Sequence, residues 1–254
     1  MKKKLAFVAV VLAVFIAADW MQEILSLFAP YKGLYQRYSF YVPASLKSLL
    51  QCGLVILAVS LLNRASLGAA VGEVGLRRSP NVGLLFAAAA TLPLWIVFAI
   101  VSPLAESFVV PEVFYLSVLS PLAEEVVYRG FAFGQLRRRA GWGFWPAALL
   151  PAAVFGWGHA EDAGDLGTGL AIFLLTGVGA VLFAWLYERW GFNLWVPFFL
   201  HLSMNLAWNV FDVGESAFAG WLPTALQVTT MVLAILLTLY GSKRLGRVGD
   251  SDQL

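Results

Sequence analysis

The sequence is poor in cysteine, in histidine and in charge. Its single cysteine, Cys52, stands in an apolar run, so an intramolecular disulfide and a thiolate metal cluster are both excluded. Only 13% of the residues are charged and 60% are hydrophobic, whereas an ordinary soluble domain carries about 25% charged residues. This composition predicts an all-α, polytopic integral membrane protein, with residues 1–254 forming a single membrane-embedded domain.

Three signatures of membrane enzymes are also missing. The two histidines, His159 and His201, do not form the His-Glu-x-x-His pair of site-2-type zinc enzymes. The chain has no Gly-x-Ser-Gly, the motif of a rhomboid-type serine nucleophile, and Asp165 is not part of a presenilin-type Gly-x-Gly-Asp. We interpret Glu161, Asp162 and Asp165 as a solvated acidic loop rather than as ligands.

Eight stretches are long and apolar enough to cross a bilayer, which takes about 20 residues in an α-helix. The predicted spans are 5–28, 44–63, 82–104, 112–136, 144–160, 168–187, 193–211 and 222–241. The first follows three lysines and also resembles a signal peptide, with small residues at Ala17 and Ala18. We expect this span to be retained, because Ile24–Phe28 extends the apolar run.

The basic residues fall mostly on one side of this arrangement. Those expected on that side are Lys2, Lys3, Lys4, Arg64, Arg77, Arg78, Arg137, Arg138, Arg139, Arg189, Lys243, Arg244 and Arg247. The other side receives Lys32, Arg37 and Lys47 with the loops around Glu106, Glu112, Glu161, Asp162, Asp165, Asp212 and Glu215. The positive-inside rule then places both termini in the cytoplasm, and the short loops are typical of a prokaryotic plasma membrane.

Two carboxylates and a guanidinium interrupt the fourth span. Glu125 and Arg129 are four residues apart, so they share a helix face, with the acid in the favourable N-terminal position. Glu124 points about 100° away, which leaves it free to face a cavity and act as a general base. A buried ion pair that only holds helices together would explain Glu125 and Arg129 equally well, but it does not explain Glu124. Gly130 is expected to let another helix approach closely.

Both histidines lie in apolar sequence. His159 follows Phe155 by four residues, so the two rings are expected to pack together. His201 precedes Asn205 by four residues, so one helix face offers an imidazole, which can bind metal or move protons, and an amide that can donate to an oxyanion. Each cluster alone is compatible with polar contacts between helices. A free carboxylate, two imidazoles and an amide together indicate a catalytic site.

The order Glu-Glu-x-x-x-Arg, Phe-x-x-x-His and His-x-x-x-Asn resembles the CPBP family, the Rce1-like or Abi group of CAAX-type intramembrane proteases. The resemblance is strong over residues 119–209. It implies an endopeptidase that cuts near a membrane-embedded or lipid-linked peptide terminus. By this resemblance Glu124 activates the water, His159 helps to bind it, His201 and Asn205 stabilise the oxyanion, and Glu125 and Arg129 support the site.

The cofactor stays open at this stage. Glu124, His159 and His201 could ligate Zn²⁺ or another divalent metal with water as a fourth ligand. A metal-independent mechanism is equally compatible, since a glutamate that ligates metal cannot also serve freely as base. The expected partners are a peptide or protein substrate within the membrane and the lipid bilayer, with no nucleic acid. Two other functions fit the residues less well: a transporter or proton relay, and a non-catalytic regulatory or scaffold protein of the same family.

The three clusters are expected at different depths in the membrane. With a rise of about 1.5 Å per residue, Glu124 and His201 lie ~18 Å and ~12 Å into their spans, near the bilayer centre. His159 lies ~22 Å along its span from Phe144, which is nearer the outer face. Either the fifth helix begins later than Phe144 or the site opens outward.

Overall fold

The computed structural model describes residues 2–106, 108–161, 163–213 and 220–245. Within them every named element is a helix, and the one β-bridge joins Leu104 to Phe211. The prediction of an all-helical protein is therefore confirmed. Asp162 and Glu215, expected in acidic loops, and Arg247, expected on the basic side, lie outside the described residues.

Each predicted span corresponds to helix in the structure, with shifted ends. The helices outside the fourth span are α1 Lys2–Asp19, α2 Met21–Leu25, α3 Ala29–Arg37, α4 Tyr41–Asn63, α5 Leu67–Glu73, α6 Pro80–Val101, α9 Phe144–Ala160, α10 Leu166–Arg189, α11 Trp195–Val210 and α12 Trp221–Leu245. The first span was drawn too long, because its helix ends at Asp19 and two short helices, α2 and α3, follow it. Asp165 is the N-cap of α10 and accepts from the backbone N–H of Gly167 and of Thr168.

Four helices are long and apolar enough to cross a membrane by themselves. They are α4, α6, α10 and the Trp221–Gly241 part of α12, so the chain is an integral membrane protein. The helices α9 and α11 have only 17 and 16 residues, and α1 begins with three lysines and ends in an aspartate. The count of eight spans therefore remains a prediction.

The fourth span is one continuous helix in which ordinary and wide turns alternate. Its parts are α7 Val110–Phe114, η1 Tyr115–Leu119, α8 Ser120–Glu124, η2 Glu125–Phe133 and η3 Gln135–Arg139, where η marks π-helix. In the wide turns an N–H reaches the carbonyl five residues back, as from Ser120 to Tyr115 and from Gly134 to Arg129. We call Val110–Arg139 the motif helix. Pro121 contributes to the first wide turn, because proline has no N–H to donate.

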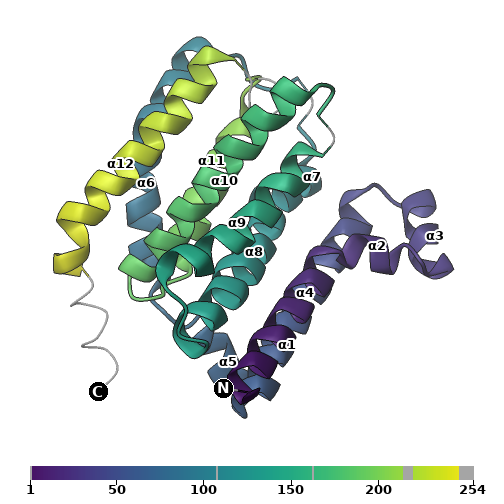
Figure 1. Ribbon diagram of the computed structural model, residues 1–254. Helices are drawn as coiled ribbons and strands as arrows, with labels where there is room; N and C mark the ends of the chain where they lie inside the picture. Colours follow the sequence, from purple (N-terminus) through teal and green to yellow (C-terminus); the bar gives the residue numbers. More distant parts are fainter. Residues whose placement is uncertain (1, 107, 162, 214–219, 246–254) are drawn as a thin grey trace.

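The motif helix is part of one of the two largest apolar cores of the described residues. Figure 1 shows α1 and α4 side by side at one edge of the bundle and α6 and α12 at the other, with α9, α10 and α11 between them. The first core joins α1, α4 and the motif helix through Phe15, Val55 and Phe131. The second joins α6 and α10–α12, and it includes Phe86 and Leu200. The polar motif residues are therefore carried by a helix that is packed into an apolar core.

Gly130 allows the close approach that the sequence indicates. A Cβ atom built at this position would lie 3.0 Å from both the Cβ and the carbonyl oxygen of Val74, just after α5. The segment after α5 thus packs directly on the backbone of the motif helix. A polar cluster lies next to this contact, at the end of the motif helix that carries Arg137, Arg138 and Arg139.

Glu73 is the centre of that polar cluster. Its carboxylate accepts hydrogen bonds from Arg139 at 2.7 and 2.8 Å, from Gln135 at 3.2 Å and from Asn63 at 3.1 Å. Burial tends to raise the pKa of Glu73, but the hydrogen bonds from Arg139 and Gln135 outweigh it, so the pKa of this carboxyl lies below its usual value. The same contact raises the pKa of Arg139. Glu73 thereby ties α4, α5 and the motif helix together.

We expect this cluster to make the protein sensitive to acid. The pKa of Glu73 is lower in the folded than in the unfolded protein. The ionised carboxylate therefore stabilises the fold at pH values above the unfolded pKa, about 4.3 for glutamate. This stabilisation is lost as the pH falls through the folded pKa. Glu73→Gln should therefore lower the melting temperature at pH 7, and the gap to the wild type should narrow as the pH is lowered below about 4. Thermal unfolding in detergent at a series of pH values measures this gap. A gap independent of pH would contradict the assignment.

Candidate active site

Glu124 ends α8 and presents its carboxylate to open space. Its side chain is 28% exposed, and its Oε1 accepts a hydrogen bond of 2.9 Å from the Ser120 hydroxyl one turn earlier. Its Oε2 lies 3.8 Å from Nε2 of His201 on α11. One oxygen is therefore held by its own helix, and the other is oriented toward the neighbouring helix.

Glu125 points the other way and is fully buried. Its Oε1 is 3.0 Å from Nη1 of Arg129 and 3.0 Å from Nδ1 of His201. The expected pair of Glu125 and Arg129 is therefore present, and His201 joins it. Since an ionised carboxylate only accepts hydrogen bonds, Nδ1 of His201 must donate, and this bond fixes the orientation of the imidazole.

Aromatic rings enclose the rest of the Arg129 guanidinium. Its centre lies 5.0 Å from the Phe155 ring and 5.2 Å from the Phe183 ring, within the range of cation–π attraction. Phe183 also makes an edge contact with His201, with ring centres 5.7 Å apart. Arg129 is only 3% exposed, so its charge is neutralised by Glu125 and by these two rings.

His159 is the last residue but one of α9. Its ring packs on Phe155 with centres 4.3 Å apart, as the four-residue spacing predicts. Its Nδ1 is 2.8 Å from the Phe155 carbonyl oxygen. A carbonyl can only accept, so Nδ1 carries the proton and Nε2 of the neutral ring is an acceptor. Because α9 begins at Phe144, the idea that this helix starts later is wrong.

Asn205 and Asn209 fasten α11 to the wide turn of the motif helix. The Asn205 amide donates to the Leu116 carbonyl at 3.2 Å, and the Asn209 amide donates to the Ser117 hydroxyl at 3.3 Å. Leu116 needs such a donor, because the N–H of Ser120 goes to Tyr115 and Pro121 has none to give. The amide nitrogen of Asn205 has a second N–H, so a donor remains for another group.

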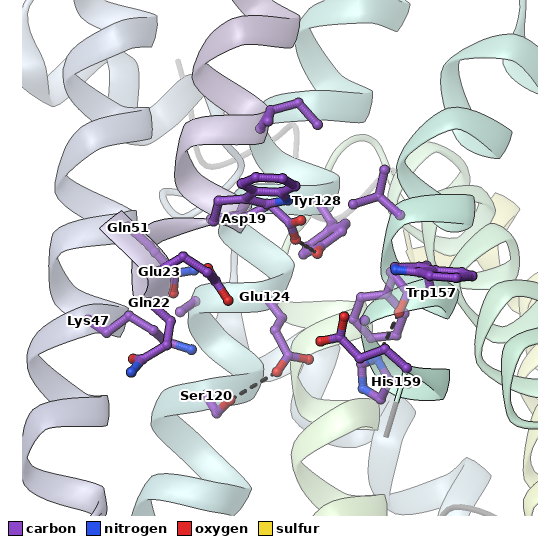
Figure 2. Close-up of a pocket in the computed structure, with 18 of the residues that line it drawn as sticks. Asp19, Gln22, Glu23, Lys47, Gln51, Ser120, Glu124, Tyr128, Trp157 and His159 are labelled. Atoms are coloured by element: carbon purple, nitrogen blue, oxygen red, sulfur yellow. Dashed lines mark hydrogen bonds between the residues drawn. The ribbon is translucent and has the colours of Figure 1, made fainter. Parts of the chain in front are cut away.

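Two cavities meet at Glu124, Phe155 and His159, which line both. The larger, about 810 Å³, lies between α1, α4, the motif helix and α9. The smaller, about 470 Å³, is lined further by Arg129, His201 and Asn205. Figure 2 shows Glu124 and His159 on the wall of the larger cavity, with Asp19 and Tyr128 joined by a hydrogen bond beside them. Five of the six predicted site residues thus line the cavities, and the sixth, Glu125, is buried behind them.

The predicted metal ligands are not arranged as a metal site. Among the residues that the structure describes, no three His, Cys, Asp or Glu side chains are grouped so that they could hold one ion. His201 directs Nδ1 to Glu125 and Nε2 toward Glu124, while His159 approaches from α9. Zinc at Glu124, His159 and His201 stays a prediction to be measured.

Several polar residues of the site were not singled out from the sequence. Ser120 is four residues before Glu124, so the spacing rule for helix faces could have found it. Asp19 is an ionisable residue at the end of an apolar run, and such residues mark functional sites in membranes. Asn209 is four residues after Asn205, so the same rule could have found it. Ser117 carries no such signal, because only the wide turn of the motif helix brings it to Asn209.

Comparison with known proteins points to one family. Residues 106–207 match the family described as type II CAAX prenyl endopeptidase Rce1-like. This part of the chain is therefore similar to the Rce1-like family. It contains all six candidate residues, from Glu124 to Asn205, whereas α1–α6 and α12 lie outside it. The resemblance that the three motifs carry is therefore confirmed.

One curated relative supports the same assignment. The chain is 35% identical over 89 residues to "Putative membrane peptidase YdiL" of Bacillus subtilis (strain 168). The aligned region is 35% of this chain and 32% of that protein, so the chain spans about a third of the relative's length. No solved structure matches the chain.

Proposed function

We propose that this protein is an intramembrane endopeptidase that hydrolyses a peptide bond near a membrane-embedded or lipid-linked terminus. The observation that carries the proposal is the position of Glu124 where two cavities meet, with His159 on the same walls and His201 Nε2 at 3.8 Å. The similarity of residues 106–207 to the Rce1-like family and the similarity of the chain to a membrane peptidase support it.

In the first step Glu124 removes a proton from water. Ser120 holds Oε1 of Glu124, so Oε2 is the oxygen that faces the water. Nε2 of His159 is an acceptor, and it can hold the second hydrogen of the same water molecule. The hydroxide formed attacks the scissile carbonyl carbon. The rate gained from such a positioned base is about 10²–10⁴-fold.

In the second step the site stabilises the oxyanion and releases the amine. Asn205 and His201 lie on the wall of the smaller cavity together with Glu124. The free N–H of Asn205 would donate to the tetrahedral oxyanion. Nε2 of His201 would donate to it as well when the ring carries protons on both nitrogens, since Nδ1 is already engaged with Glu125. Glu124, now protonated, gives its proton to the leaving nitrogen as the carbon–nitrogen bond breaks. Glu125 and Arg129 keep His201 and the motif helix in place throughout.

The topology we propose has eight membrane-spanning helices and both termini in the cytoplasm of a prokaryotic cell. Glu73, Arg137, Arg138 and Arg139 then lie at the cytoplasmic end of the bundle, in keeping with the positive-inside rule. The larger cavity is lined by Asp19 at the end of α1, by Trp20 and by Glu161 after α9. These residues lie at the other end of the bundle. In the proposed topology the site therefore opens toward the outer face, in keeping with the position of His159.

The cellular substrate can be sought through its termini. We expect membrane proteins of cells that produce the wild type to carry cleaved ends that are missing in cells that produce Glu124→Gln. Mass spectrometry of protein termini from the two membranes measures this difference. Identical sets of termini would contradict a role in proteolysis and favour a transporter or a scaffold.

A separate measurement tests whether the peptidase activity depends on a metal ion. If the glutamate and histidine mechanism above is right, purified protein should contain no stoichiometric Zn²⁺, and its peptidase activity should survive dialysis against a chelator. Elemental analysis and activity before and after dialysis check both points. Loss of activity that Zn²⁺ restores would instead show that Glu124, His159 and His201 regroup around a metal.

A further inference from the structure

Gln227 is a buried polar side chain that lines the smaller cavity. It lies on α12, within the membrane-spanning part of that helix, and is 9% exposed. Its Oε1 has no hydrogen-bond partner among the described residues. In a membrane interior an unpaired amide costs free energy, so this position is unfavourable unless something else pairs with the amide.

The cavity beside Gln227 is continuous with the candidate active site. The same cavity is lined by Glu124, His201 and Asn205. Met204, Trp208 and Met231 also line it, and methionine side chains are easily reshaped. A peptide bound in this cavity would therefore contact both Gln227 and an adaptable apolar surface.

Small residues on α10 make room for this cavity. Gly179 and Ala180 lie on its wall, and a Cβ atom at Gly179 would be 3.3 Å from the methyl group of Met231. Larger side chains at these two positions would fill the space between α10 and α12. The cavity is thus a consequence of the sequence and not only of loose packing.

We propose that Gln227 binds the backbone of the substrate peptide, and that Met204, Trp208 and Met231 accept an apolar side chain next to the scissile bond. A carboxamide has one acceptor oxygen and two N–H donors, the same pair of functions that a peptide group offers in reverse. The buried Oε1 becomes available to a peptide N–H when the Gln227 side chain rotates into the cavity that it lines, whereas an acyl chain offers no such donor. This inference rests on the proposed function, since it assigns the substrate path of that site.

A binding role and a structural role of Gln227 predict different effects of the same substitution. Gln227→Met keeps the length of the side chain and removes the unpaired amide, so it should raise the melting temperature of the free protein. The same change should weaken the binding of a peptide about fivefold to tenfold, the equivalent of about one hydrogen bond. A residue that only supported the fold would show the opposite effect on stability.

The test measures binding and does not depend on cleavage. A short, dye-labelled peptide of leucine, alanine and valine is titrated into full-length Glu124→Gln protein in detergent, with and without Gln227→Met. Thr229→Val is the control, because Thr229 is an exposed residue of the same helix that bonds to its own backbone at Ala225. Ester analogues of the peptide, each lacking one backbone N–H, are then compared.

The expected result has two parts. Gln227→Met weakens binding while Thr229→Val does not, and one ester position weakens binding to the protein with Gln227 but not to Gln227→Met. Equal affinity of both proteins, or no binding of the peptide to any of them, would overturn the inference. Binding that depends on Gln227 in a protein that never cleaves peptides would leave the inference standing and contradict the proposed protease activity.

Discussion

Glu124→Gln should reduce peptide-bond cleavage by about 10²–10⁴-fold, because the amide cannot take a proton from water and the step depends on a positioned base. The amide still accepts a hydrogen bond from Ser120 through its oxygen, so the local structure is kept. Cleavage of a fluorogenic apolar peptide by protein reconstituted in lipid vesicles measures the loss. The melting temperature should stay close to that of the wild type.

A matched control distinguishes the base from a general effect of charge. Glu23 lines the larger cavity together with Glu124, but it lies on the short helix α2 and not on the motif helix. Glu23→Gln removes the same charge from the same cavity, and we expect its activity to stay within a few-fold of the wild type. Similar losses for the two variants, or full activity of Glu124→Gln, would contradict the assignment of Glu124 as the base.

Arg129→Leu should destabilise the protein by about 3–5 kcal/mol, the cost of leaving one partner of a buried ion pair uncompensated. Arg129 is 3% exposed and Glu125 is fully buried, so water cannot take over the role of the guanidinium. The cation–π contacts with Phe155 and Phe183 are lost as well. The free energy of unfolding in mixed micelles measures the effect. Adding Glu125→Gln to Arg129→Leu should restore part of the loss.

The pair of Arg137 and Glu188 offers the comparison. Its atoms approach to 2.7 Å, closer than those of Arg129 and Glu125, but its side chains are 36% and 23% exposed. Partly exposed pairs contribute about 0–1 kcal/mol, so Arg137→Leu should cost far less than Arg129→Leu. Equal costs would mean that burial does not determine the importance of Arg129, and that the site is more open to water than the structure shows.

Much of the fold could be predicted because apolar runs define membrane helices. The run 44–63 corresponds to α4 Tyr41–Asn63, and the run 144–160 to α9 Phe144–Ala160. The end of the first span was placed too far along the chain, because the apolar residues Ile24–Phe28 after the polar stretch Asp19–Glu23 were counted with the run. The wide turns of the motif helix were also missed, since the sequence does not show which carbonyl each N–H reaches.

In the candidate site, too, only the contacts within single helices could be predicted from the sequence. Spacing alone predicted that Glu125 pairs with Arg129 and that Phe155 packs on His159, because residues four apart are neighbours on any helix. No comparable spacing rule predicts which residues of different helices contact each other. The bond from His201 to Glu125 and the bond from Asn205 to Leu116 depend on how α11 packs on the motif helix, and Gln227 becomes notable only once α12 is placed.

The central claim is that Glu124 and His159 hold one water molecule where the two cavities meet. An experimental structure in a lipid nanodisc, at a resolution that shows solvent, tests it most directly. The account predicts a single water within hydrogen-bonding distance of Oε2 of Glu124 and of Nε2 of His159, next to His201. If the two side chains contact separate solvent sites with packed protein between them, the account is wrong.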